Sequence, residues 1–182
     1  KVFGACGEAG AIVCNDEKTR ELVTTLRHNG LKNREICTDV SLNARMDTIQ
    51  AAILLQRLAK HEEVIQRRIE IANFYNERLN NCEFLPSEAR NRRDIFYTYT
   101  IQVDDRDGLM EFMNQKGIET KIHHPVLLPN QPAYQPASGE WEVASHLVQR
   151  MLSIPVHEKL TTEAVAYIVK QINAFTKKAS QA

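Results

Sequence analysis

Residues 1–11 read Lys1-Val2-Phe3-Gly4-Ala5-Cys6-Gly7-Glu8-Ala9-Gly10-Ala11. Three glycines between positions 4 and 10 favour a loop that turns tightly or passes close to another backbone. By residue type alone, a lysine before such a loop is most often a surface or anion-binding residue. The apolar run at 11–14 predicts a short buried strand. Asn15 and Asp16 then offer an N-cap for a helix that ends near Gly30.

The remaining chain predicts further helices and strands. Apolar residues from Met46 to Leu58 and again from Ile65 to Leu79 recur at helical spacing, whereas 31–42 is polar and predicts an irregular surface loop. The segment 96–103 is rich in β-branched and aromatic residues and predicts a strand. After it we expect a helix closed by Gly117, a strand-like segment at 118–122, a proline-rich loop at 125–136, a helix from Trp141 to Met151, and a last helix capped near Thr161.

Composition and charge narrow the function classes. The chain has 182 residues, of which 43% are hydrophobic and 25% charged, as is typical of a globular protein. Lysine and arginine total 23, as do aspartate and glutamate, which argues against a general binder of nucleic acid or acidic membranes. No apolar run approaches the roughly 18 residues of a membrane helix. The four cysteines lack metal-like spacing and favour a reducing, cytoplasmic compartment.

Four blocks of sequence carry a family resemblance. Residues 1–16 resemble the region that follows the Schiff-base lysine in DegT/StrS-type sugar aminotransferases, which are pyridoxal-phosphate enzymes of fold type I. The segment 42–52, with Asn43, Arg45 and Gln50, is similar to that family's N-x-R-[LM]-x-x-[IL]-Q-A-A pattern. Residues 123–134 and 152–161 resemble its H-Y-P…Q-P-A-[YF] and L-S-[LI]-P…L-T segments. The blocks follow the family's order, and the resemblance covers nearly the whole chain.

The resemblance implies an α/β fold class: the tail of a fold-type-I large domain followed by a small α+β C-terminal domain. We therefore expect residues 1–60 to complete the cofactor-binding domain, 61–85 to form a connecting helix, 86–178 the small domain and 179–182 a tail. The chain would be the C-terminal portion of a longer protein. The implied cofactor is pyridoxal 5′-phosphate, held by Lys1, and the implied assembly is a homodimer with shared active sites.

The segment 43–50 has a structural and a functional interpretation. Asn43 could cap the helix that begins near Met46, whereas the resemblance makes it a contact to the cofactor phosphate of the neighbouring subunit. Arg45 could be an ordinary surface charge, or it could bind an anionic group of the substrate, for which a planar guanidinium is suited. We expect Gln50 to be structural.

His123 and His124 are adjacent, so their side chains should diverge, and a shared zinc site is not expected. From residue type, we expect one histidine to be packed and the other exposed. The resemblance places both over the substrate. The chain departs from the family pattern here, since His124 replaces a common tyrosine and Pro129 a common histidine. These two departures bear on which sugar the protein uses and not on the reaction that it catalyses.

Together these features predict an aminotransferase that transfers an amino group, usually from glutamate, to a nucleotide-linked keto-sugar in amino-sugar biosynthesis, as in antibiotic or polysaccharide pathways. A first alternative is the same reaction on a keto-sugar phosphate. A second is a non-catalytic regulatory or interaction domain that keeps only the fold. A dehydratase variant of the family has histidine in place of the lysine, and Lys1 argues against it.

Overall fold

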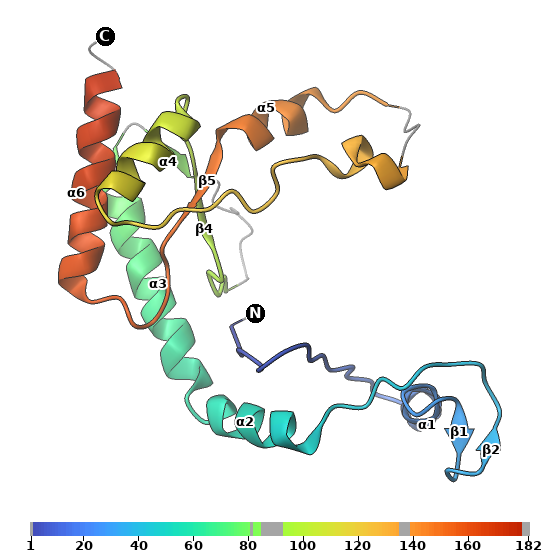
Figure 1. Ribbon diagram of the computed structural model, residues 1–182. Helices are drawn as coiled ribbons and strands as arrows, with labels where there is room; N and C mark the ends of the chain where they lie inside the picture. Colours follow the sequence, from blue (N-terminus) through green and yellow to red (C-terminus); the bar gives the residue numbers. More distant parts are fainter. Residues whose placement is uncertain (1, 81, 85–92, 135–138, 180–182) are drawn as a thin grey trace. The chain divides into compact units, whose positions relative to one another are not determined.

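The computed structural model describes residues 2–80, 82–84, 93–134 and 139–179. The chain divides into two compact units, Lys1–Glu62 and Glu63–Ala182, and most of their helices and strands are labelled in Figure 1. No described helix is both long enough and apolar enough to span a bilayer.

The first unit contains helix α1 (Glu17–Leu26), strands β1 (Leu31–Lys32) and β2 (Ile36–Cys37), and helix α2 (Thr48–Leu58). Asp16 caps α1 by accepting a hydrogen bond from the Thr19 N–H at 2.7 Å, which confirms the predicted N-cap. β1 and β2 pair as a short antiparallel hairpin, so the irregular loop predicted for 31–42 is wrong in this part. Gly30 precedes the hairpin with φ of 67°, and a Cβ there would clash with the Asp39 carbonyl oxygen.

Neither α1 nor α2 contains a buried residue. The segments of the first unit are connected instead by backbone and polar contacts. The Ser41 hydroxyl donates to the Leu26 carbonyl at 2.6 Å, and the Asn29 N–H donates to the Leu42 carbonyl at 3.1 Å. The strand predicted at 11–14 is wrong: this segment has no regular structure, and Val13 is 91% exposed. A strand needs a neighbour for its hydrogen bonds, and no described segment pairs with 11–14.

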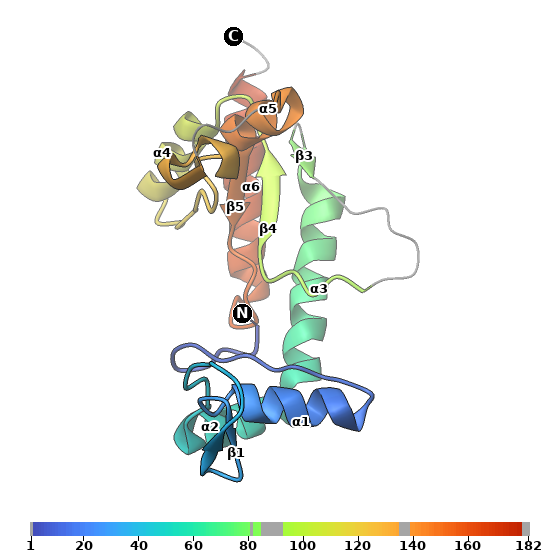
Figure 2. The ribbon, with the colours of Figure 1, turned by 90° about the vertical axis from the view of Figure 1, so that its right-hand side faces the viewer.

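The second unit is built on an antiparallel sheet in the order β3 (Glu83–Phe84), β4 (Tyr99–Gln102) and β5 (Met151–Ile154). Helices α3 (His61–Arg78) and α6 (Thr162–Ala179) lie on one side of β4 and β5, and α5 (Glu142–Arg150) lies on the other (Figures 1 and 2). Helix α4 (Arg106–Gln115) packs on α6, and short 3-10 turns occupy Leu128–Asn130 and Pro132–Tyr134.

The hydrophobic core of this unit lies between the sheet and the helices. Tyr99 and Ile101 in β4 and Val103 just after it are buried at alternate positions, as strand geometry requires, and Gln102 between them is buried as well. The other core members come from α3, α4, β5 and α6 and from the segments after α4 and β5: Ile71, Ala72, Tyr75, Leu109, Met113, Ile118, Leu152, Ile154, Val156, Val165, Ile168, Val169 and Ile172. Since α3 contributes to this core, the predicted connecting helix packs as part of the second unit. The exact domain bounds stay a prediction.

Several predicted elements agree with the structure. The predicted strand contains β4, the predicted helix before Gly117 is α4, and Thr161 caps α6 through its hydroxyl. Two predictions need correction. The helix predicted to reach Met151 ends at Arg150, because Met151 is already the first residue of β5. The strand-like segment 118–122 pairs only at Lys121, through a bridge to Ser153.

Candidate active site

Lys1 lies outside the described residues, but the glycine segment that follows it is held at Cys6 by the side chain of Gln50. The Cys6 N–H donates to Gln50 Oε1 at 2.9 Å, and Gln50 Nε2 donates to the Cys6 carbonyl at 2.7 Å. The next residue, Gly7, has φ of 118°, a backbone conformation that other residues rarely adopt. Gln50 therefore has the structural role expected from sequence, and it shapes the backbone five residues after Lys1.

Asn43 does not cap a helix. Helix α2 begins at Thr48 with Asp47 in the N-cap position, so the capping interpretation of Asn43 is wrong. Asn43 instead forms a backbone bridge with His28, and its Oδ1 accepts from the N–H and the Nε of Arg45 at 3.3 and 3.1 Å. Within the described chain, these contacts leave the Nδ2 group of Asn43 available as a donor.

Arg45 lies at the edge of two cavities. One, of about 310 Å³, is lined by the glycine segment at Glu8, Ala9 and Gly10 and by residues 44–46. The other, of about 240 Å³, lies towards the β1–β2 hairpin. Arg45 and Asn43 thus sit next to each other, and Arg45 sits next to the glycine segment that follows Lys1. An amide and a guanidinium in this position can donate hydrogen bonds to an anion.

His123 and His124 lie in the second unit, and both are exposed, so the expectation of one packed histidine is wrong. Their ring centroids are 6.3 Å apart. Both line a cavity of about 280 Å³ together with Tyr97, whose ring centroid lies 6.4 Å from that of His123. In the part of the chain that the structure describes, no three or more His, Cys, Asp or Glu side chains are grouped so that they could hold a metal ion.

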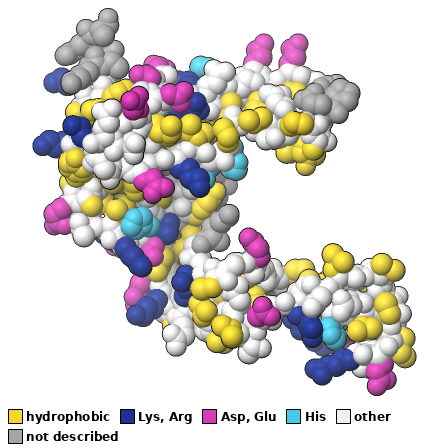
Figure 3. Space-filling view, in the orientation of Figure 1, with side chains coloured by type: hydrophobic (Ala, Val, Ile, Leu, Met, Phe, Trp, Pro, Cys, Tyr) yellow, Lys and Arg dark blue, Asp and Glu magenta, His cyan; other side chains and the backbone are white. Residues whose placement is uncertain are grey.

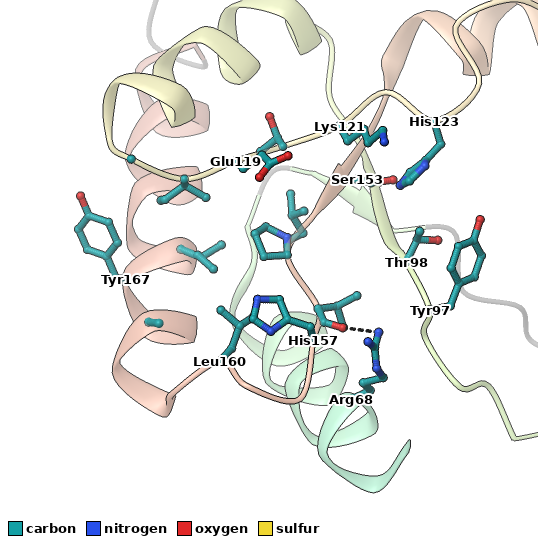
Figure 4. A pocket seen from close by; sticks show the side chains of 18 residues that line it. Arg68, Tyr97, Thr98, Glu119, Lys121, His123, Ser153, His157, Leu160 and Tyr167 are labelled. Atoms are coloured by element: carbon teal, nitrogen blue, oxygen red, sulfur yellow. Dashed lines mark hydrogen bonds between the residues drawn. The ribbon is translucent and has the colours of Figure 1, made fainter. Parts of the chain in front are cut away.

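A larger cavity of about 510 Å³ adjoins His123 (Figure 4). Its lining includes the apolar Ile154 and Leu160 and carries both signs of charge, with Glu119 and Lys121 at one end and His157 at another. A lining of mixed charge does not select an anion, so this cavity offers apolar contact with polar groups around it.

Arg68 fixes the lower edge of this cavity. It donates to the Val156 carbonyl at 2.7 Å and the Phe96 carbonyl at 3.2 Å, and it pairs with Glu158 at 3.1 Å. Partial burial raises the pKa of the Glu158 carboxyl, but its own backbone N–H and Arg68 outweigh burial and hold the pKa below the usual value. Phe96 and Val156 directly precede Tyr97 and His157, so the Arg68 guanidinium joins the segment that carries Tyr97 to the segment that carries His157.

Three residues that line these cavities carry no functional signal in the sequence. Tyr97 lies within the strand predicted at 96–103 and looks like a strand residue, although the observed strand β4 begins only at Tyr99. Arg27 and Arg34 look like ordinary surface charges in the sequence, and only the fold brings them to the cavity of Arg45.

Comparison with known proteins gives a consistent match. The model of the DegT/DnrJ/EryC1/StrS aminotransferase family matches residues 1–173. The UDP-2-acetamido-2-deoxy-3-oxo-D-glucuronate aminotransferase of Pseudomonas aeruginosa is 30% identical over 169 residues, which cover 92% of this chain and 47% of that protein.

Two solved structures are similar in fold. A DegT/DnrJ/EryC1/StrS aminotransferase from Brucella abortus is 31% identical with a TM-score of 0.90, over 97% of this chain and 48% of that one. The DesV protein of S. venezuelae, solved in complex with a ketimine intermediate, is 26% identical with a TM-score of 0.91, over 97% and 49%. The chain therefore spans about half the length of the relatives it matches.

Proposed function

Because the chain belongs to the DegT/DnrJ/EryC1/StrS aminotransferase family, we propose that the protein transfers an amino group, usually from glutamate, to a nucleotide-linked keto-sugar in amino-sugar biosynthesis. The observation that carries this proposal is the family match over residues 1–173. A sugar aminotransferase among the relatives supports the same chemistry. Neither alternative, a non-catalytic interaction domain or a keto-sugar phosphate as substrate, is favoured by these relatives, since the Pseudomonas aeruginosa protein is named for a UDP-linked keto-sugar.

The donor groups of the first unit suit pyridoxal 5′-phosphate. Its phosphate is an anion that needs several hydrogen-bond donors, and the Asn43 amide keeps donors available beside the Arg45 guanidinium. When bound, the cofactor supplies the electron sink for the reaction. Lys1 is proposed to hold it covalently and then to move a proton with its released amine. Asn43 is proposed to bind the cofactor phosphate, and Gln50 to keep the backbone after Lys1 in place.

Arg45, His123 and His124 are proposed to bind the substrate. Arg45 offers a planar pair of donors to an anionic group. The two exposed histidines and Tyr97 line a cavity that could orient the sugar. The change to His124 from the family's common tyrosine makes this cavity the part of the site that decides which sugar is used.

We also propose a homodimer in which Asn43 of one subunit serves the site of the partner. A mixed dimer tests this arrangement directly: Lys1→Ala and Asn43→Ala subunits are combined under conditions where subunits exchange. In a shared site both defects fall in one of the two sites, so the mixture should recover up to one working site per heterodimer. A mixture as impaired as its parents would refute the sharing.

A cytoplasmic location is proposed as well. It rests on the sequence, in which the four cysteines are scattered and lack metal-like spacing.

The proposed activity is tested with the full-length protein, pyridoxal 5′-phosphate, glutamate and a panel of nucleotide-linked keto-sugars and keto-sugar phosphates. We expect 2-oxoglutarate to form with at least one keto-sugar. Lys1→Ala should abolish it, while Lys18→Ala, a change to an exposed lysine on α1, should not. A protein that is loaded with the cofactor and forms no 2-oxoglutarate with any member of the panel would contradict the proposal.

A further inference from the structure

The cavity of about 240 Å³ in the first unit has an unusual charge. It lies between the C-terminal end of α1, the β1–β2 hairpin and the segment that follows Asn43. Three arginines and one histidine line it: Arg27, Arg34, Arg45 and His28. Thr24 and Asn33 add a hydroxyl and an amide, and no acidic residue among those that the structure describes lines the cavity. Figure 3 shows arginine and lysine side chains gathered beside a histidine on this unit.

These arginines are not neutralised within the described chain. Arg45 bonds to Asn43 Oδ1, and no described carboxylate pairs with Arg27, Arg34 or Arg45. By contrast, Arg20, one to two turns earlier on α1, pairs with Glu17. Like charges gathered around one cavity repel each other, and their repulsion is relieved when an anion enters. The partial negative charge at the C-terminal end of α1 offsets only part of three full positive charges.

Backbone contacts fix the walls of the cavity. The Ala44 N–H donates to the Arg27 carbonyl at 2.9 Å, and His28 bridges to Asn43. These contacts hold the end of α1 against the segment that carries Arg45. The backbone positions from which the Arg27 and Arg45 side chains extend are therefore fixed relative to each other. Preorganised donors lose less entropy when a ligand binds.

The third arginine occupies a backbone position that its residue type disfavours. Asn33 and Arg34 have φ of 54° and 65°, and the Glu35 N–H donates to the Lys32 carbonyl across them. Positive φ at both central residues is the geometry of a type I′ turn, in which Asn-Gly is the preferred pair. Arginine is less stable than glycine in this backbone conformation, because its Cβ crowds the following carbonyl oxygen. An arginine kept where glycine would be more stable points to a use for its side chain.

We propose that this cavity is a binding site for a phosphoryl oxyanion, with Arg27, Arg34 and Arg45 as its charged donors. Guanidinium groups match phosphate oxygens in pairs, which ammonium groups do not. The cavity is below the size that encloses a whole drug-sized ligand, so it fits one anionic group of a larger molecule. We assign this anionic group to the substrate, an assignment that rests on the proposed function. The group would be the diphosphate of a nucleotide-linked sugar or the phosphate of a sugar phosphate.

Isothermal titration calorimetry of the cofactor-loaded full-length protein tests this site with inorganic pyrophosphate and inorganic phosphate as probes. The informative variant is Arg34→Gly, which removes the guanidinium and creates the preferred Asn-Gly turn, so it should melt at the wild-type temperature or above. We expect its affinity for the better probe to fall roughly tenfold to 100-fold, as when a charged hydrogen-bond partner is lost. The matched control is Arg20→Gln, which removes the same charge from α1 outside the cavity and should bind as the wild type does.

Tighter binding of pyrophosphate assigns the cavity to a diphosphate, and tighter binding of phosphate assigns it to a monophosphate. The inference is overturned if neither probe binds the wild type, if Arg34→Gly binds like the wild type, or if Arg20→Gln loses as much affinity. Its failure is separate from that of the proposed function. If the protein is active but Arg34→Gly does not change probe binding, only the oxyanion site is refuted. If the protein is inactive but shows the expected differences in binding, only the proposed transamination is refuted.

Discussion

Gln50→Ala tests whether one side chain holds the glycine segment in the shape that the cofactor requires. The change removes two hydrogen bonds to the Cys6 backbone, of 2.9 and 2.7 Å, in a half-buried position. Each is worth about 0.5–1.5 kcal/mol, so the loss is about 1–3 kcal/mol. If this free energy is spent on ordering the segment when the cofactor binds, affinity for pyridoxal 5′-phosphate should fall roughly fivefold to 150-fold.

The assay titrates cofactor-free full-length protein with pyridoxal 5′-phosphate and follows its absorbance. Gln56→Ala is the matched control, because Gln56 lies on the same helix, is exposed, and contacts no part of the glycine segment. The thermal midpoint should change little in Gln50→Ala, since the hydrophobic core lies in the second unit. Unchanged cofactor affinity in Gln50→Ala, or an equal loss in Gln56→Ala, would refute the positioning role of Gln50.

Three further predictions concern the second unit. Leu152→Ala, at a fully buried position, should lower the free energy of unfolding by about 2–5 kcal/mol through lost contacts and a residual cavity; a loss below 1 kcal/mol in denaturant titrations would contradict the described core. The lowered pKa of Glu158 stabilises the fold at pH values above the unfolded carboxyl pKa, and this contribution is lost as pH falls through the folded pKa. The thermal midpoints of wild type and Glu158→Gln should therefore differ at neutral pH and converge in acid, whereas a constant difference would show that the ion pair with Arg68 is not its source. Burial raises the pKa of the Cys82 thiol to about 11, so iodoacetamide should alkylate it at pH 8 more slowly than the exposed Cys37; equal rates by mass spectrometry would contradict its burial.

Much of the second unit could be predicted from sequence because its core pattern is local. The alternation around Tyr99 marks β4, and the hydroxyl of Thr161 marks the start of α6. The start of β5 at Met151 was missed because its residues also continue the helical apolar spacing of α5. Short apolar segments fit both periods, and only the pairing of β5 with β4 decides between them.

The first unit was harder to predict because its form depends on contacts between distant residues. The run at 11–14 has the composition of a buried strand but is exposed here. The turn at Asn33 and Arg34 lacks the glycine that normally signals it, so the hairpin was missed. Asn43 and Arg45 were identified through their motif, whereas Arg27 and Arg34 join Arg45 only after folding.

The central claim, that Lys1 carries the cofactor of an aminotransferase, is tested most directly by borohydride reduction of the full-length protein loaded with pyridoxal 5′-phosphate. Reduction converts an imine between a lysine and the cofactor into a stable covalent bond, which peptide mass spectrometry can locate. We predict that the visible absorbance of the cofactor disappears and that the adduct is found on Lys1. An adduct on Lys18 or Lys121 instead, or no adduct at all, would contradict the claim.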